Sequence, residues 1–72
     1  MFVKIHVYND GDVELTKLAA PCPLTEDLSF DVRGGHTNVL RAELIGYGHD
    51  EDRVDEAIKN VMAAEEHDPI IL

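Results

Sequence analysis

The strongest constraint on the fold is an amphipathic, acidic stretch at residues 50–68. Val54, Ile58 and Val61 recur at spacings of four and three residues, so a helix over this stretch can bury one face. Pro69 follows directly and cannot continue a helix. The pattern therefore predicts a C-terminal helix over residues 50–68 that packs against the remainder of the chain.

The same stretch carries most of the net charge. It contains eight carboxylates against Arg53 and Lys59, a formal charge of −6 within a chain total of −9. Asp50 is the predicted N-cap, and acidic residues in the first turn are favoured by the helix dipole. We expect an exposed acidic face that binds a partner through Asp52, Asp55, Glu56 and Glu66.

The N-terminal third of the chain has the pattern of a β-hairpin. Residues 1–8 alternate polar and apolar side chains, which is the period of a half-buried strand. Asp10 and Gly11 follow, and an Asp-Gly pair between alternating runs is typical of a type I′ turn. We therefore expect residues 13–18 to return antiparallel to the first strand.

A second hairpin is predicted from residues 28–33 and 39–47, separated by two adjacent glycines. Asn38 could instead cap a short helix, because some of the following residues also have helical spacing. A strand over residues 39–47 is preferred because apolar residues alternate there and because Gly46 and Gly48 disfavour a helix.

Residues 1–72 thus predict a single small α+β domain: a four-stranded antiparallel sheet of two hairpins, with one C-terminal helix across one face, in the order ββββα. Residues 70–72 either add an edge strand or pack under the helix. The other face of the sheet is left uncovered by this arrangement. Its expected side chains suggest a homodimer or partner interface: Phe2, Tyr8, Val39, Ile45 and Tyr47.

No catalytic, metal or cofactor motif emerges from the residue pattern. The histidines at positions 6, 36, 49 and 67 lack the spacing of known zinc motifs, and the single cysteine excludes sites built on cysteine pairs. Cys22 lies between two prolines, and its acidic neighbours disfavour a reactive thiolate. We expect a chain that is not an enzyme, needs no metal or cofactor, has no internal disulfide and resides in the reducing cytoplasm.

Fifteen acidic against six basic residues oppose direct binding to nucleic acid or to anionic membranes and favour a basic partner. The hypothesis is a small inhibitor that presents its acidic helix face to the basic site of a nucleic-acid-binding protein. DNA mimics, phage anti-defence proteins such as anti-CRISPR proteins, and antitoxins are the classes it suits. The alternative is a salt-adapted or self-assembling structural domain without an inhibitory role.

One short segment resembles a known family. Residues 44–48, Leu-Ile-Gly-Tyr-Gly, followed by Asp-Glu-Ala-Ile at residues 55–58, resemble the last strand, glycine turn and Glu-Ala helix of HicB-like antitoxin domains. The distance from the glycines to Glu-Ala is longer here than in that family. No residue role is therefore transferred.

Overall fold

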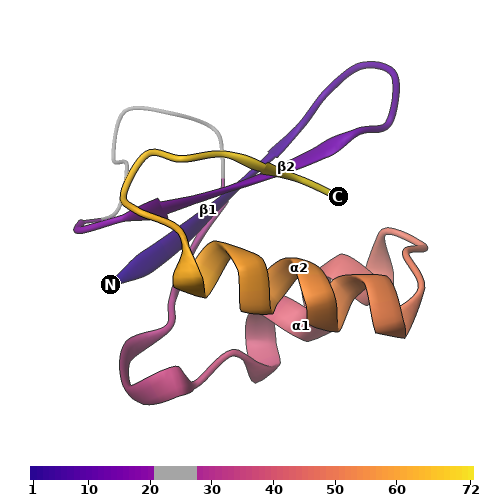
Figure 1. Ribbon diagram of the computed structural model, residues 1–72. Helices are drawn as coiled ribbons and strands as arrows, with labels where there is room; N and C mark the ends of the chain where they lie inside the picture. The colour runs from indigo at the N-terminus through magenta and orange to yellow at the C-terminus, as the bar shows by residue number, and fades with distance from the viewer. Residues whose placement is uncertain (21–27) are drawn as a thin grey trace.

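The computed structural model describes residues 1–20 and 28–72 (Figure 1). Within these residues, three strands are followed by a short 3-10 helix, two α-helices and a last strand. The α+β class and the four-stranded antiparallel sheet are confirmed, whereas the order ββββα with a single helix is wrong. The prediction made for Cys22 lies outside the described residues.

The predicted N-terminal hairpin is present as β1 (Phe2–Val7) and β2 (Val13–Leu18). Ile5 lies opposite Leu15, and both are buried on the same face of the sheet. Because side chains alternate along a strand, Phe2 and the other even-numbered residues of β1 point to the opposite face.

The turn of this hairpin differs from the prediction. The Tyr8 amide donates to the Asp12 carbonyl at 2.8 Å, and the Gly11 amide donates to the Tyr8 carbonyl at 3.0 Å. These bonds enclose a three-residue loop in which Gly11 has a φ of +95°. A type I′ turn would require a positive φ at Asp10, and among the described non-glycine residues only His67 has one. A single glycine at the third loop position is therefore sufficient for the reversal.

The other two strands lie on either side of the hairpin, giving the order β3-β1-β2-β4. β3 (Leu28–Asp31) pairs antiparallel with β1, and β4 (Ile70–Ile71) pairs antiparallel with β2. The predicted pairing of residues 28–33 with residues 39–47 is therefore wrong. Both alternatives for residues 70–72 apply, because Ile70 and Ile71 form an edge strand while Ile70 and Leu72 pack against the core.

Residues 39–47 do not form a strand but belong to α1 (Asn38–Gly46), which follows a 3-10 turn, η1 (Arg33–Gly35). Leu40 and Leu44 are buried on one side of α1, one turn apart. Their spacing satisfies both a strand and a helix, which is why the alternation was misleading. The glycines mark the end of the helix, since Gly48, with a φ of +94°, donates its amide to the Ile45 carbonyl at 2.9 Å.

The second helix, α2 (Glu51–Ala63), begins where it was predicted, with Asp50 at the N-cap position. The side chain of Asp50 makes no capping hydrogen bond. The helix ends five residues before Asp68, because the backbone of Ala64 is extended, with a φ of −72° and a ψ of 162°. The turn that follows contains His67 in the left-handed region.

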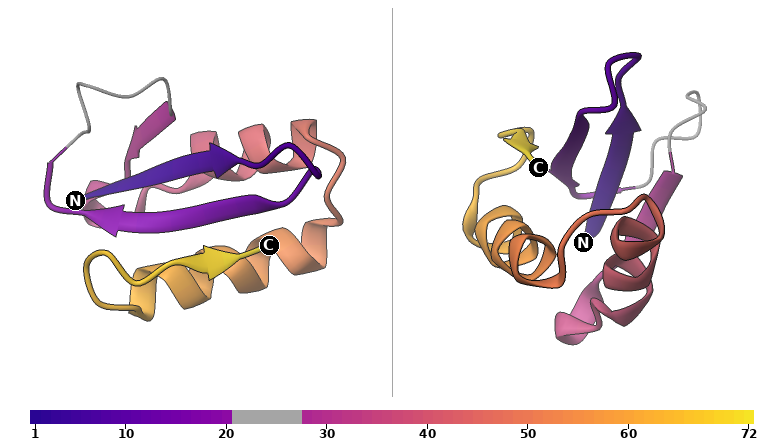
Figure 2. Two further views of the ribbon diagram at one scale, coloured as in Figure 1. Left: turned by 90° about the horizontal axis from the view of Figure 1, so that it is seen from above. Right: turned by 90° about the vertical axis from the view of Figure 1, so that its right-hand side faces the viewer.

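Both helices cover the same face of the sheet (Figure 2). α1 and α2 contact each other, and α2 also contacts β2 and β4. One hydrophobic core lies between the two layers. It contains Val3, Ile5, Val13, Leu15, Val32, Leu40, Leu44, Val54, Ala57, Ile58 and Val61.

Two substitutions in α1 test its helical packing. Leu44 is fully buried, so Leu44→Ala should lower the free energy of unfolding by about 2–5 kcal/mol. Ala42 is exposed on the helix, although a strand over residues 39–47 would have turned it inward. Ala42→Lys should therefore change the free energy of unfolding by no more than about 0.5 kcal/mol, measured by urea denaturation. If Ala42→Lys is as destabilising as Leu44→Ala, the helical assignment of α1 is wrong.

Candidate functional site

The exposed side of α2 carries a small group of carboxylates that we call the acidic face: Asp52, Asp55 and Glu56. Asp52 and Glu56 are one helical turn apart, which places their side chains about 5–6 Å from each other. Both are exposed, and neither forms an ion pair with any described residue. The opposite side of α2 is anchored in the core by Val54 and Val61, so the backbone that carries these carboxylates is held in place.

Asp55 differs from the other two because it is already paired. Arg41 of α1 donates through Nε to Asp55 Oδ1 at 2.7 Å, and its Nη2 lies 3.8 Å from Glu51 Oε2. The hydrogen bond to Asp55 is the main reason that the pKa of the Arg41 guanidinium is raised. The structure therefore places Asp55 toward α1, where its charge is partly neutralised.

Glu66, the fourth predicted partner-binding residue, lies beyond the end of α2. It is exposed in the turn that leads to β4, together with Glu65 and Asp68. From Asp52 to the last residue of α2 the helix rises roughly 16 Å, at about 1.5 Å per residue. Glu66 therefore belongs to a second acidic segment at the far end of α2 rather than to the acidic face.

The position of the acidic face agrees with the electrostatics of the helix. Glu51 and Asp52 lie in the first turn, where the positive end of the helix dipole stabilises negative charge. The last turn of α2 has no basic residue, but Lys17 of β2 donates through Nζ to the Met62 carbonyl at 3.2 Å. A cation from the sheet thus interacts favourably with the negative end of the α2 dipole.

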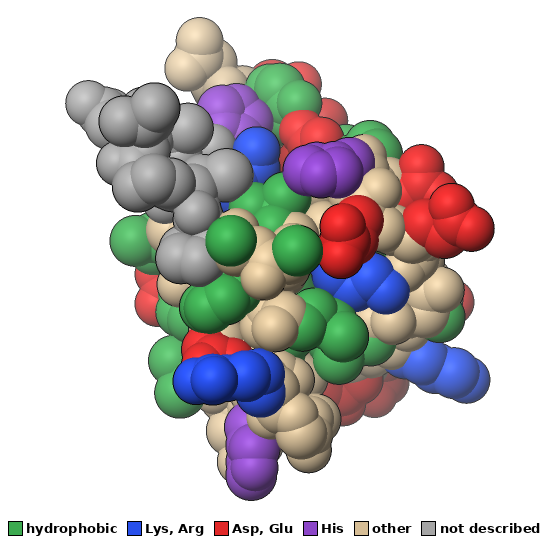
Figure 3. Space-filling view, turned by 90° about the vertical axis from the view of Figure 1, so that its left-hand side faces the viewer, with side chains coloured by type: hydrophobic (Ala, Val, Ile, Leu, Met, Phe, Trp, Pro, Cys, Tyr) green, Lys and Arg blue, Asp and Glu red, His purple; other side chains and the backbone are tan. Residues whose placement is uncertain are grey.

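Acidic side chains differ in whether a cation pairs with them. In the face of the molecule seen in Figure 3, hydrophobic side chains occupy much of the centre and acidic ones lie on several sides of them. On the opposite side of the sheet from the helices, Asp31 is held by Arg33, whose hydrogen bonds lower the pKa of that carboxyl. Asp31 therefore has a cationic partner, unlike Asp52 and Glu56 of α2.

The second predicted interface does not form one surface. Val39, Ile45 and Tyr47 were expected on the open sheet face, but they lie on or at the end of α1. Phe2 and Tyr8 do belong to the side of the sheet that no described helix covers. The strand placement of the first three residues is wrong because residues 39–47 are helical. Association through any of these five side chains stays a prediction.

Tyr47 instead forms a side-chain hydrogen bond with a residue of α1. Its hydroxyl donates to Glu43 Oε1 at 3.2 Å, and 43% of the residue is exposed. Burial raises the pKa of the Tyr47 hydroxyl, and the hydrogen bond to Glu43 raises it further.

On the sheet face, the rings of His6 and Tyr8 meet edge to face with centroids 4.5 Å apart.

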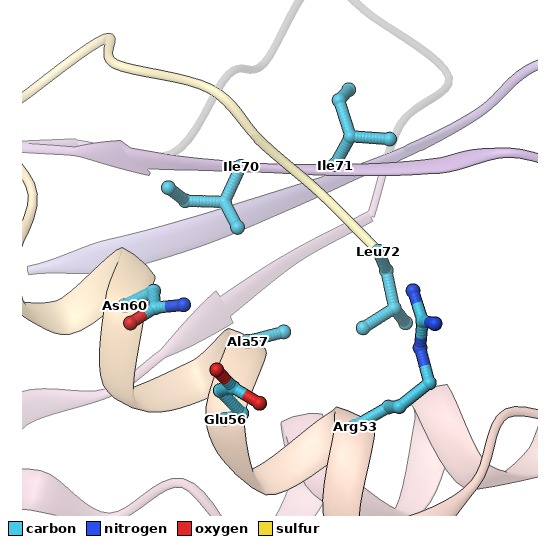
Figure 4. Close-up of a pocket in the computed structure, with 7 residues that line it drawn as sticks. All are labelled: Arg53, Glu56, Ala57, Asn60, Ile70, Ile71 and Leu72. Atoms are coloured by element: carbon cyan, nitrogen blue, oxygen red, sulfur yellow. The ribbon is translucent and has the colours of Figure 1, made fainter.

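A hollow that the sequence did not predict lies between α2 and β4. We call it the β4 groove. It has a volume of about 300 Å³ and, as Figure 4 shows, is enclosed by one flank of α2 and by the chain end. Its lining residues are Arg53, Glu56, Ala57, Asn60, Ile70, Ile71 and Leu72. The apolar residues after Pro69 are the sequence feature that could have indicated this groove. Their position beside α2, however, depends on the order of the strands in the sheet.

The described residues contain neither a metal-binding cluster nor a membrane-spanning helix. No group of three or more His, Cys, Asp or Glu side chains in this part of the chain is arranged to hold a metal ion. Neither of its α-helices has the length and apolar character needed to cross a bilayer.

Comparison with known proteins adds no assignment. No protein-family model, curated protein or solved structure matches this chain.

Proposed function

We propose that this chain is a small protein-binding module whose acidic face occupies a basic, nucleic-acid-binding surface of a partner protein. The observation that supports the proposal is the pair Asp52 and Glu56, which are exposed, have no ion pair with a described residue and are carried by a helix anchored in the core. A structural role would favour balanced charges at this spacing, because unlike pairs stabilise a helix and like pairs destabilise it.

The proposed mechanism is substitution of carboxylates for phosphates. A basic groove that normally neutralises nucleic-acid phosphates can also attract a row of carboxylates, and the competition excludes DNA or RNA. Long-range attraction between the acidic chain and such a groove accelerates association and makes it sensitive to salt. Glu66 and its acidic neighbours after α2 would extend the contact toward the other end of the helix.

This mechanism needs neither a catalytic group nor a metal, and it belongs in the compartment where the nucleic-acid-binding partner works, which we propose is the cytoplasm. DNA mimics, phage anti-defence proteins including anti-CRISPR proteins, and antitoxins act in this general way. The chain itself should not bind nucleic acid, because its net charge of −9 repels the phosphate backbone.

Neutralising the acidic face tests the proposal. The triple variant Asp52→Asn, Asp55→Asn, Glu56→Gln should still fold, because all three side chains are exposed. It should lose capture of a basic nucleic-acid-binding protein from host extract, measured by pull-down with washes of rising ionic strength and by mass spectrometry. The matched control removes three charges at the hairpin through Asp10→Asn, Asp12→Asn and Glu14→Gln, and it should retain capture. Equal capture by both triple variants would contradict the mimic model.

A second test increases the acidity of the face. Arg41→Gln removes the cation that pairs with Asp55, so the variant should bind the same basic partner more tightly, by roughly threefold to tenfold. Arg33→Gln removes the cation of the Arg33–Asp31 pair on the other side of the sheet and is the matched control. Dissociation constants from calorimetry at fixed salt compare the two. If Arg33→Gln tightens binding as much as Arg41→Gln, attraction by overall charge, and not the acidic face, is responsible.

The alternative is a salt-adapted or self-assembling domain, in which surplus acid maintains solubility at high salt. Under that hypothesis, neutralising the acidic face and neutralising the acidic residues of the hairpin should have the same effect. The hypothesis also requires folding itself to depend on salt, which is a separate property from partner binding.

A further inference from the structure

The β4 groove lies along the β4 edge of the sheet. β4 is the last strand in the order β3-β1-β2-β4, so among the described residues only its β2 side is paired. Ile70 lies opposite Leu15, and the Leu72 amide donates to the Val13 carbonyl at 2.8 Å. Backbone groups alternate in direction along an antiparallel strand, so the amide and carbonyl of Ile71 point away from β2. These two groups can pair with a further strand.

The groove beside this edge is lined by both polar and apolar side chains. Ile70 and Leu72 point from the chain end toward α2, where Ala57 faces them (Figure 4). Arg53 and Asn60 lie toward the two ends of this flank of α2. Arg53 forms no ion pair with any described residue, so its guanidinium donors are available to carbonyl oxygens.

We propose that the β4 groove binds an extended, basic segment of the partner protein as an additional antiparallel strand. The segment would exchange two backbone hydrogen bonds with Ile71 and insert apolar side chains between β4 and α2. The inference rests on the proposed function and deepens it, because Glu56 belongs both to the acidic face and to the groove lining. One partner can therefore contact both surfaces of α2.

Charge distinguishes this occupant from a second copy of the chain. Pairing two β4 edges would bring together two molecules that each carry a formal charge of −9. Like charges across an interface are unfavourable, whereas lysines on an added strand are attracted to the net negative charge of the chain. Charge complementarity therefore favours a basic segment.

Strand geometry also predicts the sequence pattern of that segment. The residue opposite Ile71 shares its direction, away from the helices, and the residues on either side of it point toward α2. The expected pattern therefore alternates basic residues with aliphatic ones. A probe with this pattern is a five-residue peptide, blocked at both ends, with lysine at its odd positions and valine at its even positions.

The test measures amide hydrogen exchange at Ile71 by NMR spectroscopy while this peptide is added. At saturation, exchange of the Ile71 amide should slow by at least tenfold. A control peptide with proline in place of the central lysine lacks the central amide donor and should give much weaker protection. Absence of protection with the lysine peptide, or equal protection with both peptides, would overturn the proposal.

Two protein variants separate the groove from general attraction. Asn60→Trp fills the groove and should weaken peptide binding by at least tenfold, whereas Ala63→Trp, on an exposed position outside the lining, should leave it unchanged. Both positions are exposed, so both variants should fold. Equal affinities for the peptide would show that the groove is not the binding site. Slow exchange of Ile71 that depends on protein concentration without peptide would identify a second copy as the occupant and overturn the proposal.

Failure of this inference can be distinguished from failure of the proposed function. The variant Asp52→Asn with Asp55→Asn alters the acidic face but leaves every groove residue in place. If it still captures the basic partner, the phosphate-mimic model fails, even where Ile71 protection persists. If capture is lost in that variant but Ile71 is never protected in the wild type, the groove inference alone fails.

Discussion

The packing of α2 against the β1–β2 hairpin is the interaction on which the rest of the structure depends. Val54 and Val61 of α2 and Val13 and Leu15 of β2 are fully or almost fully buried and belong to one core. A chain of 72 residues has enough apolar surface for only one such core, so both helices share one face of the sheet. This arrangement assigns three directions to α2: toward the core, toward α1 and toward solvent beside β4.

The side of α2 that stabilises the fold is therefore different from the side that carries exposed charge. The core side of α2 is apolar, the α1 side holds the Arg41–Asp55 pair, and the exposed side carries Asp52 and Glu56 without a described cation. The helix dipole stabilises Asp52 in the first turn without neutralising it. A basic partner would supply the missing neutralisation, and the edge of β4 that pairs with no described strand lies close enough to join the same contact.

The parts of the fold specified by local pattern were predictable from sequence. The β1–β2 hairpin, the start of α2 at Asp50 and its buried stripe followed from alternation, turn residues and helical spacing. Residues 39–47 were not, because Leu40 and Leu44 fit both periods and the glycines close a helix as readily as they interrupt a strand. Pairing of β3 with β1, and the groove beside β4, depend on contacts between distant segments that no local pattern encodes. Glu66 was misplaced because the acidic run continues past the last buried residues of α2.

The central claim is that the charge of the acidic face is not needed for folding and is therefore available for binding. Urea unfolding of the wild type and of the variant Asp52→Asn, Asp55→Asn, Glu56→Gln, at low and at molar salt, tests it most directly. We expect both proteins to be folded at low salt, with the variant at least as stable. The difference should shrink as salt shortens the screening length to about 3 Å at 1 M. A wild type that folds only at molar salt, together with a variant that loses this requirement, would contradict the account and identify the acidic face as an adaptation to salt.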